Sequence, residues 1–155
     1  MNYVKAATIV ILAVCLTACS SKPVDDGKVP ISTTSKEARE LFVQAQDLND
    51  KLRGNEAIPL LQQAVALDSN FAQAHLLMSQ TAPGAAECFA SLEAARRTAT
   101  FASEAEQWMI QAFDAAVAGN TTQQLQTLQK LAAARPGDER VHMLMGNFYF
   151  AQQNW

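Results

Sequence analysis

Apolar residues between Ser35 and Trp155 recur with helical spacing, in segments separated by short polar breaks. Ser35 precedes the first segment, whose apolar residues are Ala38, Leu41, Phe42, Ala45, Leu48 and Leu52. The break Arg53-Gly54-Asn55 follows, and the second segment carries Ala57, Leu60, Leu61, Ala64, Val65 and Leu67. This spacing places one apolar stripe on each helix. Because the connection is short, the two helices are predicted to pack antiparallel.

The pattern becomes irregular in the middle of the chain and regular again after it. Helical spacing resumes at Ala72, but Thr81-Ala82-Pro83-Gly84 interrupts it and predicts a shortened helix. A normal helix is predicted from Ala85 to Ala99. Two more helices are predicted on either side of Gly119-Asn120, and a last one after Pro136. The pattern therefore predicts an all-α protein built from antiparallel helix pairs.

A period of about 34 residues runs through these segments. Leu41, His75, Trp108 and His142 are 34, 33 and 34 positions apart, and each lies early in a predicted helix. Helix-turn-helix units with this period cannot bury their apolar faces alone, so they stack on their neighbours. The predicted repeats are 35–69, 70–102, 103–136 and an incomplete 137–155.

These repeats resemble the tetratricopeptide repeat family. The residues that carry the resemblance are Ala57, Leu61 and Ala64 in one repeat, Trp108, Gly119-Asn120, Leu128 and Pro136 in another, and Met145-Gly146, Tyr149 and Trp155 in the last. The resemblance implies a right-handed superhelical solenoid of helix pairs. It also implies a concave groove, lined by the first helix of each repeat, that binds segments of other proteins.

Aligned on the repeats, seven apolar residues are expected to line that groove as the partner-binding site. They are Phe42, Leu76, Met109, Phe113, Val117, Met143 and Phe150, with Arg39, Glu106 and Arg140 at the margins. Apolar linings of this kind take amphipathic helices or extended segments, and methionine adapts to partners of varied shape. The alternative is that many of these side chains belong to the core.

The chain stops where the second helix of the fourth repeat would begin. Phe148, Tyr149, Phe150 and Trp155 would then lack a partner helix, although terminal repeats normally carry a polar outer face. We therefore expect the sequence to be part of a longer protein. The alternative is that the last helix is an apolar cap or a dimer face.

The first 18 residues have the features of a secretory signal peptide. Lys5 precedes an apolar run from Ala6 to Leu16, which is shorter than the roughly 20 residues that a membrane-spanning helix needs. Leu16-Thr17-Ala18-Cys19 resembles the lipobox of bacterial lipoproteins. The resemblance implies cleavage before Cys19, a diacylglycerol thioether on its sulfur and an acyl chain such as palmitate on its amine. Ordinary cleavage after Ala18 is the alternative.

The resemblance to lipoproteins also implies a location. In Gram-negative lipoproteins a serine after the lipidated cysteine, here Ser20, implies sorting to the outer membrane, with the folded part on the periplasmic face. Residues 19–34 are polar and contain Pro23, Gly27 and Pro30, which predicts a flexible linker too polar to pack. Several acyl chains would hold such a protein firmly on a membrane.

Composition and charge exclude several classes of function. The 155 residues have a formal net charge of -3 with both signs interspersed, which argues against nucleic-acid binding. His75 and His142 replace large packing residues of the family, so a packing role is predicted. We find no catalytic constellation, metal-ligand spacing, cofactor motif or small-molecule site. The chain is therefore not expected to be an enzyme.

The sequence thus predicts a lipid-anchored scaffold or adaptor that binds other proteins in the bacterial cell envelope. The alternative is the non-catalytic repeat arm of a larger envelope enzyme or regulator, whose active domain would lie beyond residue 155.

Overall fold

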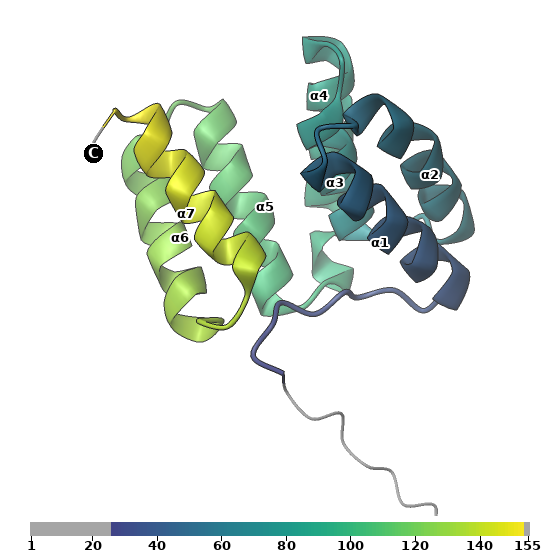
Figure 1. Ribbon diagram of the computed structural model, residues 1–155, viewed down its shortest axis with the longest axis horizontal. Coiled ribbons are helices and arrows are strands. Elements are labelled where there is room, and N and C mark those ends of the chain that lie inside the picture. Colours follow the sequence, from purple (N-terminus) through teal and green to yellow (C-terminus); the bar gives the residue numbers. More distant parts are fainter. Residues whose placement is uncertain (1–25, 154–155) are drawn as a thin grey trace, which may run out of the picture.

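The computed structural model describes residues 26–153, which are helical apart from short connections and an extended N-terminal segment (Figure 1). The elements are α1 Lys36–Asp50, α2 Gly54–Leu67, α3 Ala72–Thr81, α4 Ala85–Thr98, the 3₁₀ turn η1 Ala99–Phe101, α5 Glu104–Val117, α6 Thr121–Ala134 and α7 Glu139–Ala151. No strand occurs in this part of the chain, so the predicted all-α class is confirmed. The predicted signal peptide, Cys19 and Trp155 lie outside the described residues.

Consecutive helices pack in pairs, α1 with α2, α3 with α4, and α5 with α6, and α7 packs on α6. Figure 1 shows α1 to α4 in one group and α5 to α7 in a second group beside it. As the sequence predicted, α3 is short: it has 10 residues, whereas α4, α5 and α6 have 14 each. The two groups meet where α3, α4 and η1 contact α5.

Short polar side chains begin four of the helices. The Ser35 hydroxyl accepts from the Ala38 amide at 3.1 Å, and Asn120 and Asp138 cap α6 and α7 in the same way. Ser103 and Glu106 form a capping box, in which each side chain accepts from the other residue's backbone amide. These contacts satisfy amides that have no partner within their own helix. The starts of α1 and α6 follow Ser35 and Asn120, as the pattern predicted.

The turn after α1 differs from the prediction. Leu52 was assigned to the apolar stripe of the first helix, but it follows the helix with a φ of 60° and is 95% exposed. The Arg53 amide donates back to the Leu48 carbonyl at 2.9 Å, a bond that closes the turn. This closure requires a left-handed residue, so Leu52 points into solvent and the stripe ends earlier. Gly54 and Asn55, expected in the break, instead open α2.

Two large apolar clusters hold the helices together. One joins α1, α2 and α3 and includes Phe42 and Phe71, whose ring centroids are 5.0 Å apart. The other joins α3, α4, α5, α6 and α7, and it includes Leu76, Met109 and Val141. Val29 belongs to this second cluster although it precedes every helix. The N-terminal segment is therefore part of the packed structure.

We call residues 26–34 the strap. Residues 19–34 were predicted to be a flexible linker too polar to pack, and for residues 26–34 this prediction is wrong. Val29 is only 2% exposed, and side chains of α1, α3, α5 and α7 bind the strap backbone. Figure 1 shows the strap running from the α5–α7 group to the start of α1. The prediction failed because one valine has no periodicity and its partners are distant in sequence.

Candidate functional site

Four side chains at equivalent places in the repeats converge on the strap. Arg39, Gln73, Glu106 and Arg140 are 34, 33 and 34 positions apart, and they lie in the first turns of α1, α3, α5 and α7. We call these four residues the polar ladder. Because they share a repeat position, stacking the helix pairs brings them to one face of the protein, where the strap passes.

The polar ladder binds mainly the backbone of the strap. Arg140 Nη2 donates to the Val29 carbonyl at 2.6 Å, and Gln73 Nε2 donates to the Pro30 carbonyl at 2.5 Å. Arg39 Nη2 donates to the Ile31 carbonyl, and Glu106 Oε1 accepts from the Ser32 amide at 2.8 Å. Four consecutive strap residues thus each give one backbone group to one ladder residue. Contacts to backbone groups depend on an extended conformation more than on side-chain identity.

Glu106 is the only one of the four that is fully buried, and its carboxylate accepts four hydrogen bonds. Its carboxylate accepts from the Ser32 amide, from the Ser32 hydroxyl, from Gln73 Nε2 at 2.9 Å and from the Ser103 amide at 2.7 Å. Burying a carboxylate without hydrogen bonds is costly. The strap supplies two of its donors, so the docked strap contributes directly to the stability of this site.

Asp138, the N-cap of α7, is a second fully buried carboxylate that binds the strap. Its Oδ2 accepts from the Val29 amide at 2.6 Å, and it pairs with Arg140 Nη2 at 2.5 Å. Burial alone would raise the pKa of Asp138, but the Arg140 side chain and the Val29 amide outweigh it, so the pKa lies below its ordinary value. The carboxylate is therefore ionised at neutral pH.

Side chains of the strap add a small number of contacts. Val29 enters the apolar cluster, and the Thr33 hydroxyl donates to Asp68 Oδ2 at 2.5 Å. Lys28 Nζ lies 2.9 Å from Glu139 Oε2 at the start of α7. That contact raises the pKa of Lys28 and lowers the pKa of Glu139. Ile31 is partly buried against the other cluster, so the strap is held by two apolar side chains, one exposed ion pair, two hydroxyls and its backbone.

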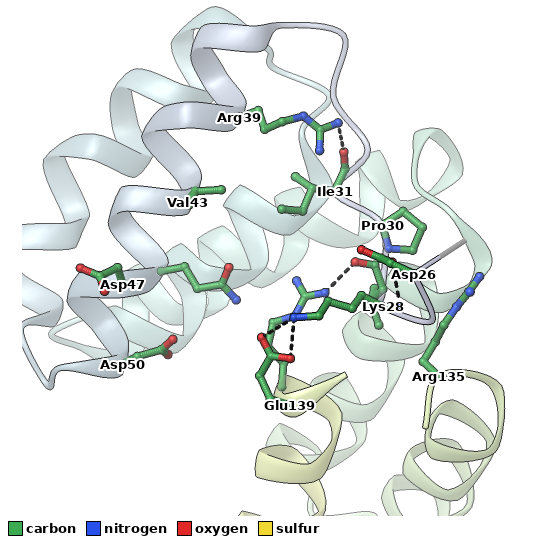
Figure 2. A pocket seen from close by; sticks show the side chains of 13 residues that line it. Asp26, Lys28, Pro30, Ile31, Arg39, Val43, Asp47, Asp50, Arg135 and Glu139 are labelled. Atoms are coloured by element: carbon green, nitrogen blue, oxygen red, sulfur yellow. Dashed lines mark hydrogen bonds and ion pairs between the residues drawn. The ribbon is translucent and has the colours of Figure 1, made fainter. Parts of the chain in front are cut away.

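A cavity of about 880 Å³ lies beside the strap (Figure 2). Figure 2 shows Arg39, Val43, Asp47 and Asp50 along α1 on one side, with Lys28, Pro30 and Ile31 of the strap and Glu139 of α7 on the other. Its size is within the range of ligand-binding clefts. The strap forms one wall of this cavity, so a molecule bound there would touch the strap and α1 together.

The seven predicted groove residues do not form one lining. Phe42, Leu76 and Met109 are buried in the core and border a cavity of about 30 Å³, which has room for a single water molecule. Phe113 and Val117 are partly buried against the same core, whereas Met143 and Phe150 are exposed on α7. None of the seven lines the larger cavity. The three residues placed at the groove margins, Arg39, Glu106 and Arg140, all bind the strap.

The two histidines occupy equivalent positions, as their spacing predicted. His75 Nε2 lies 3.1 Å from the Ser69 carbonyl, and His142 Nε2 lies 2.8 Å from the Pro136 carbonyl, in both cases six residues earlier in the chain. Each imidazole therefore ties the start of its helix to the preceding loop. In the described part of the chain, no group of three or more His, Cys, Asp or Glu residues is placed to hold a metal ion.

Sequence reasoning missed Gln73, Asp138 and Val29. Gln73 had a usable signal, since it falls on the same repeat position as Arg39, Glu106 and Arg140. Asp138 had a weaker one, because an aspartate before a predicted helix indicates an N-cap without showing what else it binds. For Val29 the local sequence contained no such signal.

No model of a known protein family matches the chain, and no match was found among curated proteins or solved structures. Within residues 26–153, none of the helices combines the length and the apolar character that crossing a membrane requires.

Proposed function

We propose that this protein is a lipid-anchored scaffold or adaptor of the bacterial cell envelope, which binds extended segments of other proteins. In this proposal the helix pairs form a right-handed superhelical solenoid similar to that of tetratricopeptide repeat proteins. Cys19 carries the lipid and holds the protein on the periplasmic face of the outer membrane. The chain itself has no catalytic role.

The observation that carries the proposal is the polar ladder. Four repeat-equivalent side chains each bind one backbone group of an extended segment, and the contacts of Arg140, Gln73 and Glu106 are 2.6, 2.5 and 2.8 Å long. Backbone hydrogen bonds give affinity for extended polypeptide, and nearby pockets give specificity. The repeat thus supplies the chemistry that a peptide-binding protein needs.

The cavity beside the strap supports the same proposal. Its α1 wall combines an apolar residue, Val43, with the carboxylates of Asp47 and Asp50 near the end of the helix. An extended segment with an apolar side chain and a basic side chain would complement this wall. We therefore place the captured segment between α1 and the strap.

The proposal is tested by crosslinking the full-length, membrane-anchored protein in its native cells and identifying captured proteins by mass spectrometry. Val43→Glu should remove the specific captures, because it adds a charge to the α1 wall of the cavity. Leu67→Glu is the matched control, since Leu67 is 46% exposed and Val43 is 47% exposed, yet Leu67 lies away from the cavity.

Two results would count against the proposal. If Val43→Glu and Leu67→Glu capture the same proteins as the unchanged chain, the cavity is not the binding site. If Cys19→Ala leaves the protein on the membrane, the lipid anchor is not at Cys19. Captured envelope proteins that are lost from Val43→Glu alone would support the scaffold and identify its pathway.

A further inference from the structure

We propose that the strap is a built-in ligand, which occupies the polar ladder until an extended segment of a partner with the same chemistry replaces it. This inference rests on the proposed function, because it assumes that the repeats capture polypeptide. The inference specifies which residues the captured segment must carry, and it makes the strap the element that controls binding.

The contacts define the segment that the polar ladder accepts. Its backbone must be extended, so that three successive carbonyls reach Arg140, Gln73 and Arg39. The residue at the first of those carbonyls must be apolar and compact, because Val29 is buried there. Three positions later a hydroxyl must face Glu106, as the Ser32 hydroxyl does. The partner segment therefore carries a small branched apolar residue followed by serine or threonine at the third position after it.

An incoming segment could supply most of the contacts that the strap makes. Asp26, Lys28, Pro30 and Thr34 are exposed, and Val29 is the single fully buried side chain of the segment. Besides Val29, the side-chain contacts are the Ser32 and Thr33 hydroxyls, the Lys28–Glu139 pair and the partly buried Ile31, and the remaining contacts are to backbone groups that every polypeptide has. Replacement therefore leaves no buried ladder group without a partner, provided that the incoming segment has the same apolar and hydroxyl residues.

The cavity provides the place where exchange can begin. It opens directly beside the strap and is lined by Val29, Pro30 and Ile31 on the strap side. A segment bound there is already next to the polar ladder before the strap leaves. The exchange can therefore begin before Val29 leaves the apolar cluster.

Because the strap is covalently attached to its binding site, a partner segment needs a high affinity to replace it. A segment joined to its site by a short connection competes at an effective concentration in the millimolar range. A free segment with the same contacts is thus excluded from the unchanged protein at micromolar concentration. Loosening the strap should raise the apparent affinity for such a segment by at least about tenfold.

The test uses the full chain and a fluorescent peptide with the sequence of residues 26–34. Val29→Asp in the chain should release the strap, because it places a carboxylate in the apolar cluster and beside Asp138. Ser32→Asp should release it through a different contact, by facing Glu106 with a second carboxylate. Thr34→Asp is the matched control, since Thr34 is exposed and lies in the same segment.

Fluorescence anisotropy measures peptide binding, and hydrogen exchange at the backbone amide of residue 32 reports whether the strap is released. Val29→Asp and Ser32→Asp should both bind the peptide at least about tenfold more tightly than the unchanged chain and Thr34→Asp do. A peptide with aspartate in place of its valine should not bind. Circular dichroism should show that all variants remain helical.

Several outcomes would overturn the inference. The first is equal peptide affinity in all four chains, and the second is no peptide binding by either released variant. The third is that the amide of residue 32 stays protected from exchange in both released variants. If the peptide fails to bind while Val43→Glu still loses its captures in cells, the built-in ligand is wrong and the scaffold function stands. If the peptide binds but no envelope protein is ever captured, the scaffold function fails instead.

Discussion

The Val29 amide donates to Asp138 Oδ2 at 2.6 Å, across 109 residues of sequence. This bond joins the strap to the N-cap of the last helix, and the Asp138 carboxylate also pairs with Arg140, which itself binds the Val29 carbonyl. The three groups form a closed arrangement in which each partner orients the others. The strap and the start of α7 are therefore held together by hydrogen bonds from Val29 to both members of a buried ion pair.

The stabilisation from Asp138 should depend on pH. Its pKa is lowered in the folded protein, so its contribution is fully present above its unfolded pKa, near 3.8. The contribution is lost as pH falls through the lower folded pKa. Denaturant unfolding from pH 2 to pH 7 should show this loss only below about pH 4.

Asp138→Asn separates this effect from other titrations, because Glu139 also has a lowered pKa, through its contact with Lys28. The variant should lose about 3 kcal/mol of unfolding free energy at pH 7, since Arg140 stays buried without its carboxylate. The difference between the two proteins should shrink in acid. A difference that stays constant down to pH 2 would contradict the assignment.

Glu106→Gln should loosen the strap while the helices stay folded. An amide oxygen cannot accept all the donors that the carboxylate accepts, and its NH₂ group would face other donors, so we expect a cost of about 2 kcal/mol. Amide exchange at Ser32 should become faster while exchange in α1 is unchanged. Glu104→Gln is the control, because Glu104 is exposed in the same helix turn; equal effects of the two variants would refute a specific role for Glu106.

Leu52 and Gly119 occupy the same turn position, 67 residues apart, with φ values of 60° and 70°. The left-handed conformation costs a residue with a side chain about 1–2 kcal/mol relative to glycine. Leu52→Gly should therefore raise the melting temperature by about 3 °C, and Gly119→Ala should lower it by a similar amount. Thermal unfolding followed by circular dichroism measures both changes, and shifts of the same sign would show that the turns are not equivalent.

Phe42 tests the predicted groove lining. Because its ring packs on Phe71 within the core, Phe42→Ala should cost about 3–5 kcal/mol of unfolding free energy. Met143→Ala should cost less than about 0.5 kcal/mol, since Met143 is exposed on α7. Urea unfolding distinguishes the two. If Phe42→Ala unfolds at the same urea concentration as the unchanged chain, Phe42 is not a core residue and can again be assigned to the groove.

The helices could be predicted from the sequence because each depends on local patterns. Ser35 before an apolar stripe, Gly119-Asn120 between two stripes and Pro136 after a third marked ends that the structure reproduces within a few residues. Leu52 was misplaced because its apolar character continued the stripe, while the turn required a left-handed residue there. The pattern of apolar residues predicts which side chains are buried. It does not predict the backbone hydrogen bonds that end a helix and require a left-handed residue.

The site was less predictable because it depends on contacts between distant parts of the chain. Repeat alignment grouped Arg39, Glu106 and Arg140, which the structure brings together around the strap, but it treated buried Phe42 and Leu76 as lining. The strap appeared to be a linker, since a single valine between Lys28 and Pro30 has no periodicity. Its buried partners, Glu106 and Asp138, are charged residues that composition alone assigns to the surface.

The docked strap also limits where a lipidated molecule can sit. The strap is bound to the start of α7 at Lys28 and Val29, and seven peptide units separate its first residue, Asp26, from Cys19. These units span at most about 25 Å. If Cys19 carries the lipid, as we propose, the end of the protein formed by the start of α7 must stay close to the bilayer. Release of the strap would add its residues to the tether between Cys19 and the helices. Capture of a partner would therefore also increase the distance that the helices can reach from the membrane.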